Sequence, residues 1–207
     1  MNDHYYTKDP SSESHPVPCI FSWRGTEMRF MTDAGVFSKG ELDTGTKLLL
    51  DALPEELTGE VLDLGCGWGA IGVTLKKRYP AVTLTLSDVN LRALGLAEEN
   101  ARRNGITVEC LESDGMAALL NRRFDRIITN PPIRAGKEVI YRMFSDAAGC
   151  LKEGGALDLV IRKQQGAESC MKYLSTLYRR VEKLDRSAGF WVLEASDPIT
   201  GPADGDK

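Results

Sequence analysis

From residue 60 onward the chain alternates short apolar runs with segments of helical periodicity, and this alternation limits the possible folds more than any other feature. Apolar runs bounded by polar and turn residues predict strands at 60–65, 83–89, 106–112, 124–130 and 156–162. Helical patterns lie between and after them, at 70–79, 90–104, 137–152 and 166–180. Strands separated by helices pair in parallel through right-handed crossovers. The pattern therefore predicts an α/β fold with a doubly wound, mostly parallel, Rossmann-like sheet.

Segments on both sides of this core complete the expected architecture. Residues 181–187 and 189–195 read as two closing strands, which bring the sheet to seven strands and make one of them antiparallel. Near the start, residues 19–24 and 26–33 alternate apolar and polar side chains around Gly25. This alternation predicts a small β-hairpin that precedes the sheet.

The pattern divides the chain into three expected parts. Residues 1–54 hold a polar arm, the hairpin and a helix that packs on the core. Residues 55–196 form the α/β domain. Residues 197–207 have the composition of a flexible tail.

Composition excludes several classes of protein. The 207 residues are 42% hydrophobic and 27% charged, as expected for one globular domain. Five cysteines without C-x-x-C spacing argue against disulfides and zinc and favour a reducing cytoplasm, and the two histidines, His4 and His15, are too few for a histidine-based site. No apolar stretch approaches the roughly 18 residues of a membrane span, and the polar start is not a secretory signal. A net charge of −4 still permits a local basic patch.

A glycine-rich loop, VLDLGCGWGAIG at 61–72, joins the first sheet strand to its helix. Gly67, Gly69 and Gly72 satisfy the dinucleotide fingerprint G-x-G-x-x-G, and Asp88 ends the second strand, where an acid can hold a ribose. Such a loop lets the backbone approach a ligand closely at the N-terminus of a helix. A nicotinamide-dependent dehydrogenase is one interpretation of this loop.

The stretch D-L-G-C-G-W-G also resembles the first motif of class I S-adenosylmethionine (SAM) methyltransferases. The resemblance implies that the loop backs the methionine part of SAM and that the acid on the strand helps to hold its amino group. It also implies that an acid after the second strand binds the ribose and one after the third strand binds the adenine amino group. The positions that match these roles are Gly65, Cys66, Gly67 and Gly69 in the loop, and Asp63, Asp88 and Asp114 among the acids.

The fourth strand ends in a rigid corner, Asn130-Pro131-Pro132. If the corner is purely structural, the Asn130 side chain forms hydrogen bonds with backbone groups that are left unpaired where the strand ends. The functional interpretation starts from the conjugated lone pair of an aromatic or amide nitrogen, which makes that nitrogen a poor nucleophile. The carbonyl oxygens of the Asn130 side chain and the Pro131 backbone can accept its N–H groups and stabilise the positive charge that develops on methylation. The prolines hold the corner rigid, and the reaction needs neither a metal nor a histidine base.

The N-P-P sequence followed by an apolar residue resembles the signature of class I methyltransferases that act on exocyclic or amide nitrogen. The resemblance implies that Asn130 lies beside both the cofactor and the target. Ile133 stands where many of these enzymes carry an aromatic residue that stacks on the target base. It can pack on a flat group without π-stacking. Pro132 and Ile133 are therefore expected to bind substrate.

Motifs along nearly the whole chain, from about residue 4 to 195, resemble one family. These motifs are HYYT, TDAGVFSKGELDTGT, LDLGCGWGAIG, NPPIRAGK and VIRKQQGA. The family is that of small-subunit ribosomal RNA guanine-N2 methyltransferases, in a compact single-domain form with the class I methyltransferase fold. The resemblance implies methyl transfer to guanine N2 and implies rRNA or an assembled small subunit as partner. It also implies that Phe37 and Asp43 cover the cofactor.

Basic residues cluster in three loops that the expected topology brings to one edge of the sheet. They are Lys39, Arg134, Lys137, Arg162 and Lys163. Together they predict a basic rim suited to RNA phosphates.

The expected hairpin carries Trp23, Arg24 and Arg29. It could extend the RNA surface, act as a lid or form a dimer contact, so both a monomer and a homodimer remain open. Two other functions also remain open: methylation of a protein glutamine or a small amine, and SAM binding without catalysis. The intact Asn-Pro-Pro corner argues against a module without catalysis.

Overall fold

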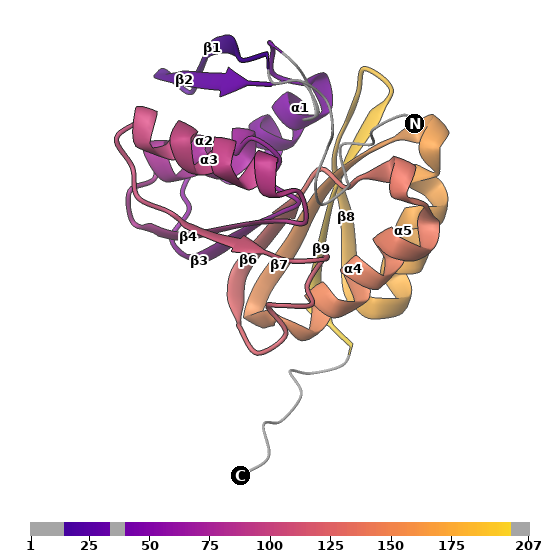
Figure 1. Ribbon diagram of the computed structural model, residues 1–207. Coiled ribbons are helices and arrows are strands. Elements are labelled where there is room, and N and C mark those ends of the chain that lie inside the picture. The colour runs from indigo at the N-terminus through magenta and orange to yellow at the C-terminus, as the bar shows by residue number, and fades with distance from the viewer. Residues whose placement is uncertain (1–14, 34–39, 200–207) are drawn as a thin grey trace.

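The computed structural model describes residues 15–33 and 40–199, so the predictions for Phe37 and Lys39 and for most of the N-terminal arm and the tail lie outside the described residues. Figure 1 shows a central sheet between two layers of helices, with a separate hairpin at one end. The sheet has seven strands in the order β5-β4-β3-β6-β7-β9-β8. Their bounds are Gly59–Leu64 (β3), Val82–Asp88 (β4), Glu109–Glu112 (β5), Phe124–Thr129 (β6), Leu151–Arg162 (β7), Tyr178–Ser187 (β8) and Phe190–Pro198 (β9).

The pairing of the strands confirms the predicted fold class. Strands β3, β4, β5, β6 and β7 pair in parallel, whereas β9 is antiparallel to both β7 and β8. The chain moves outward from β3 to β5 and then returns to place β6 against the other side of β3. Ligands of doubly wound sheets bind at such a reversal, beyond the carboxyl ends of the strands.

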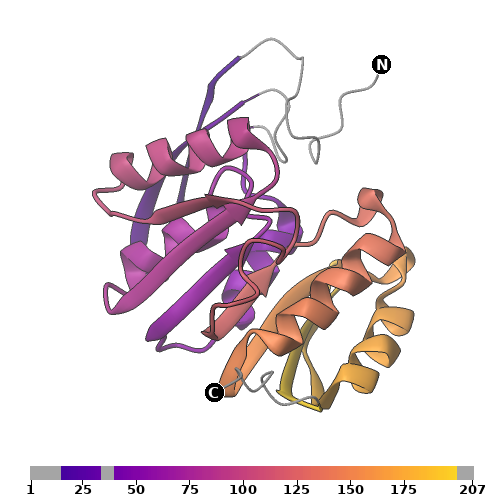
Figure 2. The same cartoon turned by 60° about the horizontal axis from the view of Figure 1, so that its bottom comes forward.

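Helices cover the two faces of the sheet in separate groups. Helices α1 (Thr44–Ala52), α2 (Ala70–Arg78) and α3 (Leu91–Arg103) lie on one face, and α4 (Lys137–Gly149) and α5 (Ala167–Leu177) lie on the other (Figures 1 and 2). Each helix layer forms a hydrophobic core with one face of the sheet, and successive residues of β7 belong to different cores. Val160 packs with the α1 layer, whereas Leu157, Leu159 and Ile161 pack with the α4 layer. This alternation follows from the pleat, which turns successive side chains to opposite faces.

Two helices, α4 and α5, end three residues before their predicted ends. Helix α4 ends at Gly149 rather than at residue 152, and β7 begins at Leu151, because the backbone of Cys150 already bonds to Phe124 at the start of β6. The register then shifts between Phe124 and Arg126, which accommodates the Gly154–Gly155 pair inside the strand. Helix α5 ends at Leu177, because Tyr178 is buried and pairs with the far end of β9.

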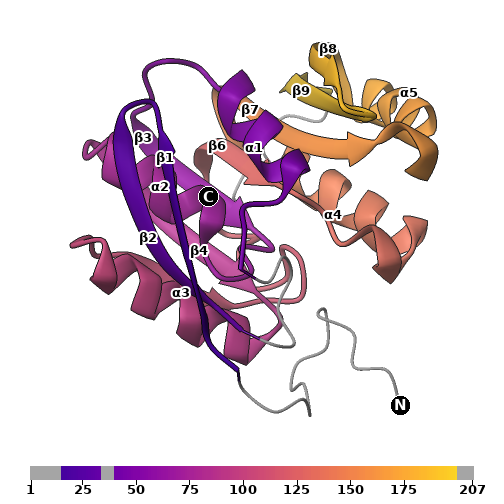
Figure 3. The ribbon, with the colours of Figure 1, turned by 90° about the horizontal axis from the view of Figure 1, so that it is seen from above.

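The predicted hairpin is present as β1 (Val17–Trp23) and β2 (Thr26–Thr32), which form a two-stranded sheet of their own. It lies along α2 and α3 (Figure 3). The Asn100 side chain of α3 accepts from the Met31 amide at 2.7 Å and donates to the Met31 carbonyl at 2.9 Å. The Asn104 side chain makes the same pair of bonds with Arg29, at 3.1 and 2.8 Å. Two buried asparagines thus satisfy this edge of β2 in place of a third strand.

The hairpin is also fixed to α1 and to the glycine loop. The Trp23 indole donates to Asp51 at 3.0 Å, and the Arg24 guanidinium donates to the backbone of Leu53 and Pro54 at 2.7 and 2.8 Å. Asn100 donates to the Trp68 carbonyl in the glycine loop at 2.9 Å. The side chains of Trp23 and Arg24 therefore form hydrogen bonds that attach the hairpin to the end of α1 and the residues after it. The division of the chain into three parts stays a prediction.

Candidate active site

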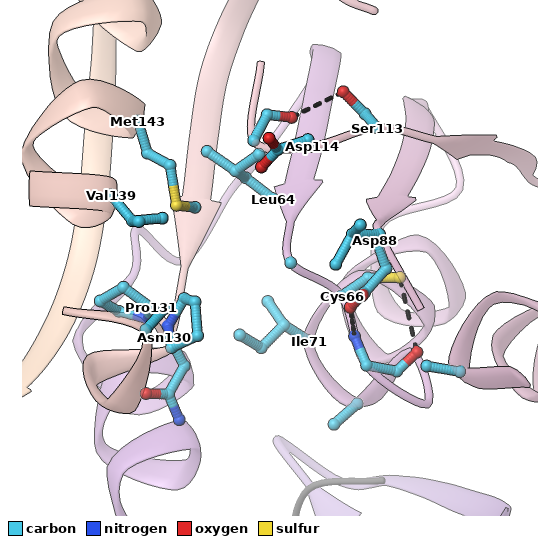
Figure 4. A pocket seen from close by; sticks show the side chains of 18 of the residues that line it. Leu64, Cys66, Ile71, Asp88, Ser113, Asp114, Asn130, Pro131, Val139 and Met143 are labelled. Carbon is cyan, nitrogen blue, oxygen red and sulfur yellow. Dashed lines mark hydrogen bonds between the residues drawn. The ribbon is translucent and has the colours of Figure 1, made fainter. Parts of the chain in front are cut away.

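A cavity of about 400 Å³ opens beyond the carboxyl ends of β3, β4 and β6 (Figure 4). Its size lies in the range of sites that enclose a small-molecule ligand. Asn130 and Pro131 lie on one side of it, and Asp88 and Cys66 lie on the other. Of the residues assigned from the sequence, it brings together Gly65, Cys66, Gly67, Asp88, Asp114, Asn130, Pro131, Pro132 and Asp43.

The glycine loop is tied to the neighbouring strand by backbone hydrogen bonds. The amides of Gly65 and Cys66 both donate to the Ser87 carbonyl of β4, at 2.8 and 2.9 Å. Gly65, Gly67 and Gly69 have φ values of 71°, 54° and 85°, which residues with a side chain rarely adopt. The loop can therefore place its backbone close to a ligand at the N-terminus of α2.

Asp88 holds the loop and also faces the cavity. Its Oδ2 accepts from the Gly67 amide at 2.8 Å, and its Oδ1 accepts from the Asn90 amide at 2.9 Å. Burial raises the pKa of Asp88, and these two hydrogen bonds oppose the shift. Each carboxylate oxygen has a further lone pair, so the group remains able to accept from ribose hydroxyls.

Cys66 is a neutral part of the cavity wall. Burial, followed by the charges of Asp88 and Asp63, raises the pKa of its thiol well above the usual value. A protonated thiol is a weak nucleophile, so this residue contributes shape rather than reactivity.

Asp63 lies behind the loop, with 1% of its surface exposed, and it does not line the cavity. Its Oδ2 accepts from the Gly72 amide at 2.8 Å, whereas Oδ1 is buried without a hydrogen-bond partner. An ammonium group or a bridging water would supply the donor that Oδ1 lacks, so the site fits the amino group of SAM. Burial raises the pKa of Asp63 to about 7, against the effect of the Gly72 hydrogen bond, and repulsion from Asp88 adds to the rise.

Asp114 follows β5 at the far end of the cavity and is exposed. The Arg142 guanidinium of α4 lies 3.1 Å from its Oδ2. Arg142, Val139 and Met143 line this part of the cavity and were missed in the sequence. Their spacing of three and four residues, directly after the Asn-Pro-Pro corner, is the pattern that could have revealed one face of a helix.

Asn130 follows β6, and its amide is held by α1. Its Nδ2 donates to Asp43 Oδ2 at 3.2 Å and to Thr46 Oγ1 at 3.0 Å. Thr46 was also missed in the sequence. The buried Pro131 carbonyl accepts from the Ile133 amide at 2.9 Å, across a tight turn at Pro132. That oxygen keeps one lone pair for another donor.

The four predicted rim cations that the structure describes, Arg134, Lys137, Arg162 and Lys163, are exposed. Within residues 15–33 and 40–199 none of them forms an ion pair; Lys137 lies over the Tyr141 ring and Arg162 over the Phe190 ring. The Lys163 amide bonds to Gly189 in the β8–β9 turn at 2.8 Å. This bond places the β8–β9 turn at the same edge of the sheet. The turn carries Arg186, which is exposed and forms no ion pair within the described residues.

Ile133 is half-buried beside the corner and does not line the cavity.

Comparison with known proteins identifies the family. Residues 27–194 match the family model described as the methyltransferase small domain. The chain belongs to the methyltransferase small domain family. This membership confirms the methyltransferase resemblance and excludes the dehydrogenase interpretation of the glycine loop.

Relatives of this methyltransferase include proteins of similar and of greater length. It is 41% identical over 198 residues to the uncharacterized protein YbxB of Bacillus subtilis, with 94% of this chain and 98% of that protein covered. It is 42% identical over 153 residues to ribosomal RNA small subunit methyltransferase C of Hahella chejuensis, with 68% of this chain and 44% of that protein covered. The chain thus spans less than half the length of the second relative.

Solved structures agree with this assignment. The 16S rRNA N2 G1207 methyltransferase (RsmC) of T. thermophilus, in complex with AdoMet and guanosine, superposes with a TM-score of 0.79 and 28% identity. The match covers 91% of this chain and 52% of that one. The ribosomal protein L11 methylase of Lactobacillus delbrueckii, at 20% identity and a TM-score of 0.62, shares the fold.

The described residues contain neither a candidate membrane-spanning helix nor a candidate metal-binding cluster. No described helix is long and apolar enough to cross a membrane. No group of three or more His, Cys, Asp or Glu side chains in the described ranges is placed to hold a metal ion.

Asp63 makes the stability of the methyltransferase depend on pH. Its pKa is about 7 in the folded protein against a usual value of 3.8, so the folded state keeps this proton longer than the unfolded state. The contribution of Asp63 to the free energy of unfolding therefore falls as the pH rises from about 4 to about 7 and changes little above that. Asp63→Asn removes the titrating group, and urea unfolding at several pH values without cofactor should show a shallower fall. The fall that is left in Asp63→Asn comes in part from Asp158, because burial raises its pKa to about 7 as well. An unchanged pH profile in Asp63→Asn would contradict this assignment.

Proposed function

We propose that this methyltransferase transfers a methyl group from SAM to the exocyclic N2 of a guanine in small-subunit rRNA. The observation that carries the proposal is the anchored amide of Asn130, which lies across one cavity from the glycine loop and Asp88. The cofactor is SAM. When bound, it supplies an electrophilic methyl group on a positively charged sulfur.

The proposed roles divide between cofactor and target. The backbone of Gly65, Cys66, Gly67 and Gly69 holds the methionine part, and Asp63 accepts from its amino group, directly or through water. Asp88 accepts from the ribose hydroxyls, and Asp114 accepts from the adenine amino group.

Asn130 and Pro131 act on the target amine. Their two carbonyl oxygens accept its N–H groups, which draws the lone pair out of conjugation and stabilises the positive charge that develops on nitrogen. The methylated nitrogen then loses its proton to solvent, so no protein base is required. Pro132 and Ile133 pack against the flat base.

RNA is favoured over a protein or small amine by the rim and by the relatives. Arg134, Lys137, Arg162, Lys163 and Arg186 supply cations for phosphates around the mouth of the site. The Hahella chejuensis relative is named as a methyltransferase of small-subunit rRNA, and the T. thermophilus neighbour is named as a 16S rRNA N2 G1207 methyltransferase. Such a substrate would place the enzyme in the cytoplasm.

Methyl transfer to defined acceptors tests this function. Labelled SAM is incubated with the enzyme and, in separate reactions, assembled small subunits, bare rRNA, ribosomal proteins or small amines, and the RNA products are digested to nucleosides. N2-methylguanosine is the expected product. Label in glutamine, in a small amine or in another nucleoside would overturn the proposed substrate.

Asn130→Ala should reduce turnover by about 10²- to 10³-fold, as the loss of one preorganised group in other active sites does. SAM affinity, measured by calorimetry, should remain largely unchanged, because the bulk of the cofactor contacts lie on the loop and the three acids. Loss of SAM binding together with activity would show that Asn130 is a cofactor-binding group instead.

The rim predicts a specific dependence on salt. The double variant Arg134→Ala/Lys163→Ala should bind rRNA more weakly and should lower the slope of log affinity against log salt by roughly one per lost phosphate contact. Arg179→Ala/Arg180→Ala is the matched control, because these arginines lie at the start of β8, at the opposite edge, and pair with Asp197 and Glu182. Equal effects of both double variants would contradict a rim at the site.

A further inference from the structure

Asp43 and Thr46 surround the amide nitrogen of Asn130 and stand at the N-terminus of α1. Asp43 caps this helix: its Oδ2 accepts from the Thr46 amide at 3.0 Å. The same oxygen accepts from Asn130 Nδ2 at 3.2 Å, and Thr46 Oγ1 accepts from it at 3.0 Å. The two N–H bonds of one side-chain amide therefore face two acceptors on one turn of helix.

These acceptors determine which way the Asn130 amide faces. The nitrogen and oxygen of an amide have almost the same shape, so their assignment rests on the hydrogen bonds around them. A carboxylate can only accept, so it must meet the NH₂ group. The oxygen then lies on the other side, and within the described part of the chain it accepts no hydrogen bond. It is left as an acceptor on a residue that lines the cavity.

Packing holds the two acceptors in place. Thr46 is 4% exposed. Gly45 lies between them, and a Cβ there would come within 2.9 Å of the Phe190 ring and 3.0 Å of Asp43 Oδ2. No larger residue fits at this position without moving Phe190 or the carboxylate. The N-terminus of α1 is thus packed against β9 while it holds the residue that follows β6.

We infer that Asp43 and Thr46 are positioning residues that orient and polarise the Asn130 carboxamide for its contact with the target amine. The inference rests on the proposed function for the role of Asn130, whereas the hydrogen bonds do not depend on the substrate. Donation of both N–H groups to acceptors, one of them charged, moves electron density toward Oδ1. Oδ1 thereby becomes a better acceptor for an amine that is gaining positive charge. The charge of Asp43 also favours that cation through the amide.

Side-chain amide exchange tests the orientation without any substrate. In NMR spectra of the full chain, the Asn130 NH₂ signals, assigned by their loss in Asn130→Ala, should exchange with solvent more slowly than those of the exposed Asn121. Asp43→Ser keeps a residue that caps helices but cannot reach Asn130, and Thr46→Val removes the hydroxyl at constant shape. Both should accelerate the Asn130 exchange, whereas Thr46→Ser should not. Exchange as fast as that of Asn121 in the unsubstituted protein would overturn the inference.

Kinetics with whichever acceptor the enzyme methylates test the consequence. Asp43→Ser should lower kcat by roughly 10- to 100-fold and Thr46→Val by about 10-fold, since both leave the preorganised acceptor misaligned. Thr46→Ser should keep most of the activity, and the melting temperature of the Asp43 and Thr46 variants should change little. Glu41→Gln is the control, because it removes an exposed charge two residues from Asp43. A kcat for Asp43→Ser and Thr46→Val equal to that of Glu41→Gln would overturn the inference. If the Asn130 amide is protected but no RNA is methylated, the proposed substrate is wrong and the positioning role stands.

Discussion

The parallel pairing of β3 with β6 determines where this enzyme can do chemistry. The register sets Asp63 beside Ile128, so both strands end at the same level and their loops leave the sheet side by side. One strand continues into the glycine loop and the other into the Asn-Pro-Pro corner. Strands are added on one side of β3 up to β5 and then on its other side from β6, so no crossover covers the space above these two strands. The cavity lined by both loops lies there.

Elements outside the sheet then hold the two loops in position. Asn100 joins the hairpin to the glycine loop through the Trp68 carbonyl, and the Trp68 ring packs edge-to-face with the ring of Phe30 of β2. On the other side, Asp43 at the start of α1 joins the corner through Asn130. The hairpin and α1 are therefore part of the framework of the site, although neither belongs to the parallel sheet. Preorganisation of this kind lets backbone and amide groups stabilise charge without moving during the reaction.

The sheet and most of the site could be predicted because both follow from local patterns and one topological rule. Apolar runs indicated the strands, and the rule that ligands bind at the carboxyl edge placed Asp88, Asp114 and Asn130 together. Arg142 and Thr46 could not be predicted in the same way, because a helix reveals its apolar face but not which polar residue reaches a neighbouring strand. The start of β7 was also missed. Its residues 151–155 have no strand pattern, and they are drawn into the sheet by the backbone bond between Phe124 and Cys150.

In the proposed reaction the Asn130 side-chain carbonyl accepts a hydrogen bond from the N2 amine of a guanine. A crystal structure of the enzyme with S-adenosylhomocysteine and guanosine tests this contact. We expect the guanine N2 within about 3 Å of Asn130 Oδ1, with the amide nitrogen still bonded to Asp43 and Thr46. A guanosine whose N2 faces away from this corner, or an Asn130 amide turned so that its nitrogen faces the base, would show that Asn130 does not accept from the target amine.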